Sequence, residues 1–311
     1  PSRSQALNNL GVIFEELEEP QKAISYYERV TKFDPNYLES INGLYTLLRR
    51  YGSTFVDKNH LKNICLFLFK KNNISHNDIS HNAQESLLTD KYENQIKEVI
   101  NSESSLLTNQ FVHNLLNEEL FHLILQKSFI TDKFLEKLLT KLRCEILFEL
   151  NNDKLKEYFD FIISFAEQCW LNEFIYTDSE EEISKINKLK NKIEESNEIN
   201  EIEIAILGCY IPLNESIIIT NKLFYYKSTN ILFNDLITIQ IKEPLKEKEL
   251  KKLIKSVYKI NDFVSKRVQE QYEEHPYPRW RHTNKFLSKT FINSLNEEIA
   301  SNKIIYNNKF N

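Results

Sequence analysis

Apolar residues recur along most of this chain at the spacing of one face of an α-helix. The clearest stripe follows the i, i+3, i+4, i+7 pattern and consists of Leu135, Leu138, Leu139, Leu142 and Ile146. A similar stripe runs from Leu155 to Cys169. The alternation that is typical of strands is confined to a few short runs. The pattern therefore predicts an all-α fold.

A two-helix pattern lies between Ser4 and Tyr37. Helices are predicted at about Gln5–Leu17 and Gln21–Phe33, because Pro20 suits the first turn of a helix and Pro35 follows the end of the second. The predicted packing positions of this hairpin are Leu7, Leu10, Gly11, Phe14, Ala23, Tyr27 and Pro35. The small residues among them allow two antiparallel helices to approach closely.

These positions resemble the tetratricopeptide repeat, a pattern of about 34 residues that forms a helical hairpin. The match departs from the family at Val30, where alanine is usual. A second repeat would begin at Leu38, but Tyr45 stands where glycine is expected, so residues 38–50 are interpreted as a capping helix. Because one repeat cannot bury both of its faces, further repeats are expected before Pro1. The resemblance implies a protein or peptide ligand in the groove of the repeat.

The chain divides into three predicted parts. Residues 1–52 form the tetratricopeptide-repeat region, residues 53–260 an irregular helical domain, and residues 261–311 a linker. In the middle part, Asp178 or Ser179 is predicted to cap a helix whose first turn carries three glutamates, which the helix dipole favours at that end.

Three β-branched runs are ambiguous. Ile202–Cys209 alternates at its start like a strand, and a strand that ended at Gly208 would suggest nucleotide binding. Pro212 and the absence of further glycines make that reading poor, so a helix is predicted there. The runs Ile217–Ile219 and Ile237–Ile241 are compatible with a minor strand.

Charge and hydropathy narrow the classes of partner. The 40 basic and 45 acidic residues are interleaved and give a net charge of −5, whereas a nucleic-acid-binding surface needs a basic stripe. No apolar run is long enough to cross a bilayer, and the chain does not begin with a signal peptide. We therefore expect a cytoplasmic protein with neither a nucleic-acid partner nor a membrane partner.

Glycine is scarce. The chain has four, each isolated: Gly11, Gly43, Gly52 and Gly208. Loops that cradle phosphates or nucleotide-like cofactors need clustered glycines, because the backbone must approach the ligand closely. P-loops and Rossmann fingerprints are therefore excluded within these residues. We expect no cofactor and no catalysis in this chain alone.

The cysteines and histidines do not form a metal-binding pattern. The cysteines lie far apart in apolar stretches and are interpreted as buried reduced thiols: Cys65, Cys144, Cys169 and Cys209. His76 and His81 are five positions apart, which is wrong for one helix face. No metal site is expected.

The most unusual segment runs from Gln269 to Trp280. A helix from about Asp262 is predicted to end near Glu274, because a proline disfavours helical geometry in the residue before it. The two prolines that follow favour an extended, polyproline-like backbone. The candidate functional residues are Tyr272, Glu273, Pro276, Tyr277, Pro278, Arg279 and Trp280.

The stretch Val268–Trp280 is similar to the segment that precedes the catalytic domain in a bacterial family of tetratricopeptide-repeat proteins with a class I S-adenosylmethionine-dependent methyltransferase domain. Segments 165–174 and 240–245 agree in kind, while His275 replaces the asparagine that the family more often has. The resemblance implies a Rossmann-like domain that begins after Asn311 and binds S-adenosylmethionine. None of the residues of that domain is present here.

Two roles are open for this segment. It braces the helical region against the downstream methyltransferase domain, or its side chains close over the cofactor or substrate and exclude water, the candidates being Tyr272, Glu273, Tyr277 and Arg279. Two functions are also open: the substrate-recruiting part of such a methyltransferase, or a freestanding helical adaptor that binds peptides. A repeat domain attached to a glycosyltransferase is a third.

Overall fold

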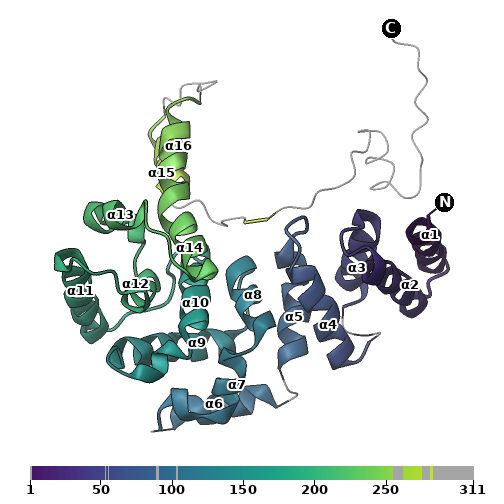
Figure 1. Ribbon diagram of the computed structural model, residues 1–311, viewed down its shortest axis with the longest axis horizontal. Coiled ribbons are helices and arrows are strands. Elements are labelled where there is room, and N and C mark those ends of the chain that lie inside the picture. Colours follow the sequence, from purple (N-terminus) through teal and green to yellow (C-terminus); the bar gives the residue numbers. More distant parts are fainter. Residues whose placement is uncertain are drawn as a thin grey trace.

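The computed structural model describes residues 2–52, 54, 56–88, 91–102, 104–254, 262–274 and 281–282. Within these ranges the chain is all-α, as predicted, and contains no strand. Figure 1 shows the helices arranged as a curved array, with α1 and α2 at one end and α11–α13 at the other. None of the helices in the described ranges has the length and apolar character that a bilayer crossing requires.

The helices of the first half are α1 (Arg3–Glu16), α2 (Pro20–Phe33), α3 (Leu38–Tyr51), α4 (Lys58–Phe69), η1 (His76–Ile79), α5 (Ser80–Leu87), α6 (Tyr92–Asn101), η2 (Leu106–Thr108), α7 (Gln110–Leu116), α8 (Glu119–Lys127) and α9 (Lys133–Phe148). Those of the second half are η3 (Asp153–Lys156), α10 (Phe159–Leu171), α11 (Glu180–Glu195), α12 (Glu201–Gly208), η4 (Leu213–Glu215), α13 (Ile217–Leu223), α14 (Ile231–Ile237), η5 (Thr238–Lys242), α15 (Glu243–Lys251) and α16 (Phe263–Glu274). The element η5 is a turn of π-helix.

Short polar side chains start most of the longer helices. The Ser2 hydroxyl accepts a hydrogen bond from the backbone N–H of Gln5 at the start of α1. Ser179 caps α11 in a reciprocal capping box with Glu182, which settles the choice between Asp178 and Ser179. Gly52 ends α3 with a φ of 62°, a conformation that costs glycine little. The predicted hairpin and the helix predicted after it are confirmed to within a few residues, whereas the capping role of that third helix stays a prediction.

The suggested minor strands are wrong. Ile217–Leu223 is helix α13, started by Ser216, whose hydroxyl accepts from the Ile219 backbone N–H. The run Ile237–Ile241 passes from α14 into the π-helix, with the side chains of Ile237 and Ile241 fully buried. Burial of these side chains against other helices outweighs their modest β propensity. The helix predicted over Ile202–Cys209 is confirmed as α12.

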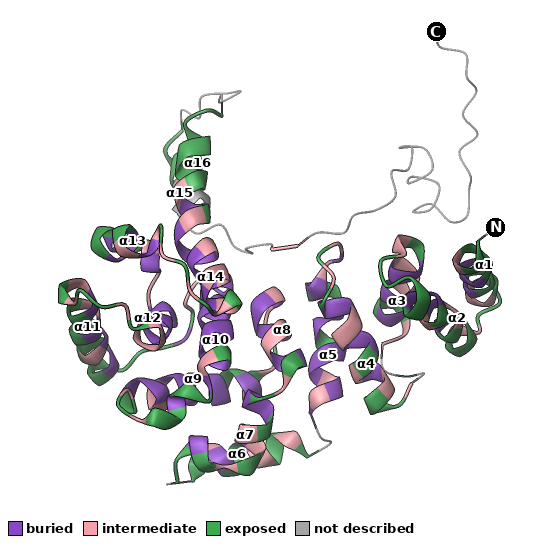
Figure 2. Cartoon of the chain, in the orientation of Figure 1, coloured by how far each residue is buried: buried purple, intermediate pink, exposed green. Residues whose placement is uncertain are grey.

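Two hydrophobic cores support the array. One joins α2–α5 with α8 and includes Tyr27 and Phe69, so the repeat region continues directly into the next helices. The other surrounds α9, α10, α12 and α14. Figure 2 shows that α10 lies at the centre of the second core, with every residue from Phe161 to Leu171 buried. The domain boundaries remain predictions.

Candidate functional site

A buried carboxylate lies at the centre of the array. Glu167 of α10 is 0% exposed, although it lies in a helix that is otherwise almost wholly apolar. Its carboxylate pairs with the guanidinium of Arg281, which belongs to the short described segment 281–282 on the inner side of the curve (Figure 1). The second terminal nitrogen of Arg281 pairs with Asp235 of α14. The first also donates to the backbone carbonyl of Gln126, at a distance of 3.0 Å. We call Glu167, Asp235 and the Gln126 carbonyl the Glu167 site.

Two helix C-termini increase the negative potential around the Glu167 site. Gln126 lies in the last turn of α8, and Arg281 therefore meets one of the carbonyls that a helix end leaves without an intrahelical partner. Lys127 does the same for α4, because its ammonium donates to the Phe69 carbonyl at 2.7 Å and to the Asn72 side chain at 2.9 Å. Arg281 and Lys127 thus each donate to a backbone carbonyl at the C-terminal end of one helix.

Burial shifts the pKa values of this cluster strongly. It raises the pKa of Glu167 to about 8, and the Arg281 guanidinium opposes that shift. It lowers the pKa of Lys127 to about 8, with the charge of Arg281 acting in the same direction. Without Arg281 the pKa of Glu167 would lie higher still, because burial would then act with less opposition.

Two histidine rings extend the cluster towards η1. The His76 ring lies 5.2 Å from that of His282 and 5.0 Å from that of Phe69, measured between centroids. The His76 Nε2–H donates to the Lys71 carbonyl at 2.8 Å. Burial lowers the pKa of His76 to about 3 and that of His282 to about 4, so both rings are neutral at physiological pH. Across the described residues, His, Cys, Asp and Glu side chains form no group able to hold a metal ion.

A buried glutamine ties the π-helix to α10. The amide of Gln240 donates to the carbonyls of Ala166 and Gly208, at 2.9 and 3.0 Å, and accepts from the Leu213 N–H at 3.2 Å. A Cβ at position 208 would lie 3.4 Å from this amide, an ordinary van der Waals contact, so the close approach does not depend on glycine. Segments 165–174 and 240–245, both quoted above for the family resemblance, thus lie together, and Arg281 pairs with Glu167 of the first segment.

The candidate residues of the aromatic segment lie at the edge of the described structure or beyond it. α16 ends at Glu274, as predicted, and contains the backbone of Tyr272 and Glu273, but their side chains are outside the description. Pro276, Tyr277, Pro278, Arg279 and Trp280 lie outside the described residues. Their role remains a prediction.

Sequence reasoning missed the Glu167–Arg281 pair. One weak signal was available: Glu167 lies among mostly apolar residues of α10, and a glutamate that becomes buried needs a cation. No local pattern identifies which of the many basic residues supplies it.

The repeat unit is organised around Tyr27. Its ring lies between Gly11 of α1 and Gly43 of α3, and its hydroxyl donates to Glu15 at 3.0 Å. Of the predicted packing positions, Leu7, Gly11, Ala23 and Tyr27 are buried and Phe14 is partly buried, stacked on Tyr26.

The other two predicted packing positions are exposed. Leu10 is 37% exposed because it shares the outer face of α1 with the exposed residues Ile13 and Leu17, one and two turns further on. Pro35 is exposed in the turn before α3, where it ends α2 without packing into the core.

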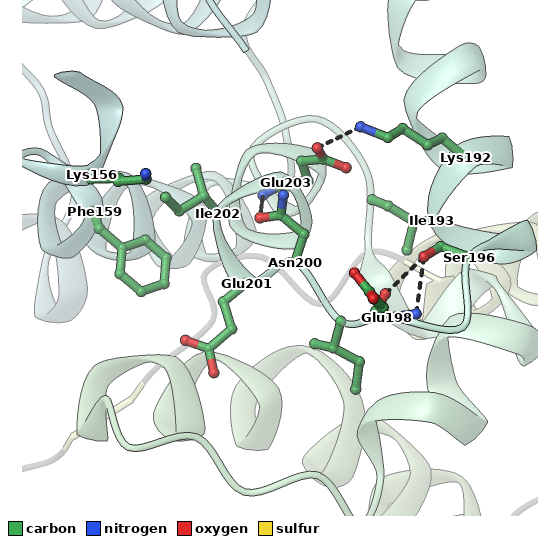
Figure 3. Close-up of a pocket in the computed structure, with 11 residues that line it drawn as sticks. Lys156, Phe159, Lys192, Ile193, Ser196, Glu198, Asn200, Glu201, Ile202 and Glu203 are labelled. Carbon is green, nitrogen blue, oxygen red and sulfur yellow. Dashed lines mark hydrogen bonds and ion pairs between the residues drawn. The ribbon is translucent and has the colours of Figure 1, made fainter. Parts of the chain in front are cut away.

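A surface pocket of about 620 Å³ lies near α11, α12 and η3 (Figure 3). Several of its charged groups already pair with one another or with neighbours: Lys192 with Glu203 at 2.6 Å, and Glu201 with the Tyr226 hydroxyl at 2.8 Å. The pocket therefore lacks the convergent groups, free to act on a ligand, that are typical of an active site.

Comparison with known proteins supports the repeat and nothing beyond it. The family model of the tetratricopeptide repeat matches residues 4–37. No curated protein and no solved structure matches the chain. The chain is thus an all-helical protein that contains a tetratricopeptide repeat.

Proposed function

We propose that this chain is a protein-binding scaffold and that its tetratricopeptide-repeat unit holds the partner. The observation that carries the proposal is the match over residues 4–37 to a repeat whose hairpins present side chains to peptides along a shared surface. The adaptor reading is therefore favoured over the methyltransferase reading.

The seam between α1 and α3 is the proposed binding surface. Asn8 accepts from the Ser40 hydroxyl at 2.8 Å, and Glu15 lies 3.5 Å from Arg50, so the two helices lie side by side. α2 covers the back of this seam, where Tyr27 packs. The side of α1 and α3 that faces away from α2 is the surface on which we place the partner.

This surface combines one apolar anchor with opposite charges. Helical spacing places Val12 and Glu16 of α1 on the side away from α2, and both are exposed. Arg49 and Arg50 are exposed on α3. These groups fit a peptide segment that places an apolar side chain against Val12 and a carboxylate against Arg49.

A displayed peptide library, selected on the whole chain, tests this function. We expect Val12→Asp to weaken the selected peptides about tenfold or more, since it places a charge against an apolar contact. Charge reversal by Arg49→Glu should have a comparable effect on acidic peptides. Ser25→Glu, on the exposed face of α2, is the matched control and should leave binding unchanged. Peptides that bind all four proteins equally, or no selected peptide at all, would overturn the proposal.

A second candidate function rests on the resemblance of segments 165–174, 240–245 and 268–280. In it, the scaffold recruits substrate for a methyltransferase domain that follows Asn311 and binds S-adenosylmethionine, and the chain contacts that domain as well as its protein ligand. The coding sequence after Asn311 tests it: a short apolar strand followed by a Gly-x-Gly turn is expected. Micromolar binding of S-adenosylmethionine to residues 1–311 in calorimetry would contradict this assignment.

A further inference from the structure

The Glu167 site has the geometry of a guanidinium receptor. Three acceptors from three helices, α8, α10 and α14, surround one side chain. One terminal nitrogen of Arg281 donates to Glu167 and to the Gln126 carbonyl, while the other meets Asp235. A planar guanidinium presents separate nitrogens to separate acceptors, whereas an ammonium is a single point charge. The arrangement therefore favours arginine over lysine.

The charges around the site favour an occupied state. Glu167, Asp235 and Glu243 contribute carboxyl groups that interact with Arg281. Lys127 is the nearby cation, and its ammonium already binds the C-terminal end of α4. His76 and His282 are neutral near physiological pH. Removing the guanidinium would leave the carboxyl groups in excess over the single lysine. Glu167 would then lose the partner that opposes the rise in its pKa and would take up a proton.

Glu167 itself has acceptor capacity to spare. Its Oε1 is buried and has no hydrogen-bond partner among the described residues, while Oε2 pairs with Arg281. Among the described contacts of the Glu167 carboxylate, the pairing of Oε2 with Arg281 is therefore the one that offsets its burial. The side chain of Arg281 is itself only 17% exposed, whereas that of Asp235 is 44% exposed and leaves the site open on one side.

We propose that the Glu167 site is a receptor for one arginine side chain. Arg281 occupies the site within the chain, and an arginine of another peptide occupies it when Arg281 is absent. Arg281 lies 114 positions after Glu167, so its insertion fixes the segment 281–282 on the inner side of the array. Covalent connection gives Arg281 a high effective concentration, and a peptide must therefore compete with it in the unmodified chain.

Chemical rescue of Arg281→Ala tests the site. We expect this variant to unfold at a lower temperature than the unmodified chain, and millimolar ethylguanidinium to restore part of the loss. Ethylammonium is the matched control and should restore less, as should the substitution Arg281→Lys. The double variant Glu167→Gln, Arg281→Ala should show no rescue. Equal rescue by both cations, or rescue of the double variant, would overturn the assignment.

Direct binding gives a second, independent readout. A synthetic peptide of residues 277–285 should bind the Arg281→Ala chain, and the same peptide with alanine in place of arginine at position 281 should bind about tenfold more weakly or worse, as expected for loss of a charged hydrogen bond. Asp235→Asn, which keeps the shape of the site, should weaken the first peptide. Val12→Asp should not, which separates this site from the proposed repeat surface. Equal binding of the two peptides would overturn the proposal.

Discussion

The ring of Tyr27 lies so close to Gly11 that a Cβ added to the glycine would come within 2.4 Å of ring atom Cε1. Gly43 bounds the ring on its other side, where an added Cβ would lie 2.5 Å from Cε2. Tyr27 is therefore the point at which α1 and α2 of the repeat meet the following helix, α3. The ring cannot move away from one glycine without approaching the other.

Gly11→Ala should destabilise the chain by about 1–3 kcal/mol, the usual cost of overpacking a core, even though alanine has the better helix propensity. Gly43→Ala should have a similar effect. Urea unfolding followed by circular dichroism measures both. Asn9→Ala, at an exposed position of α1, is the control and should change stability little. A gain in stability for Gly11→Ala would contradict the packing described for Tyr27.

Gln240→Leu should cost about 2 kcal/mol or more. The leucine leaves the buried carbonyls of Ala166 and Gly208 without their donor, and each orphaned group costs about 1–3 kcal/mol. Gln240→Glu keeps the acceptor but not the donors, so it should also destabilise. Lys248→Leu, on exposed α15, is the control. If Gln240→Leu were neutral in denaturant unfolding, the amide would not be the tie between the π-helix and α10.

Arg143→Met should destabilise the chain by about 1–3 kcal/mol, because it removes a buried donor from the Thr177 carbonyl and the partner of the half-exposed Asp178. Arg143 is 1% exposed, donates to the Thr177 carbonyl at 3.0 Å and to Asp178 at 2.6 Å, and lies over the Tyr210 ring at 4.2 Å. Arg143→Lys should also destabilise the chain, because one ammonium group cannot replace the separate N–H donors of the planar guanidinium. Thermal unfolding of the two variants and of Arg49→Met, at an exposed site, provides the comparison. Equal melting temperatures for all three would count against the role of Arg143.

Acid should weaken the fold through His76. Its pKa is about 3 in the folded chain, below the ordinary 6.5, so the unfolded chain binds the proton more readily. The stability that neutral His76 contributes is present above about pH 6.5 and is lost as the pH falls towards 3. The positive groups that face it, Lys127 and Arg281, and its neighbour His282 oppose protonation further.

His76→Phe removes this titration while keeping a ring beside Phe69. We expect the urea midpoint of the unmodified chain to fall between about pH 7 and about pH 5, and that of the variant to fall less over the same range. The comparison uses the slope with pH, so a uniform loss of stability in the variant does not obscure it. Parallel slopes would show that His76 does not control the acid response.

Much of the helical fold follows from short-range signals. Pro20 at the start of α2, the Ser179 capping box and the apolar spacing along α9 each act within a few residues, so they can be read along the chain. The hairpin at residues 4–37 could be predicted for the same reason, since its packing positions recur at fixed intervals. For the segment around position 276, the structure tests one prediction, that α16 ends at Glu274, and it confirms it.

Position in the tertiary structure decided the rest. The run Ile237–Ile241 could be strand or helix by propensity, and burial around α10 made it helical. Glu167 could have been one more acidic residue on a helix, and only the packing of its neighbours removed it from water. The partner that this burial requires is Arg281, 114 positions away. It could not be identified from the sequence, because an ion pair depends on distance in space and not on a fixed spacing along the chain.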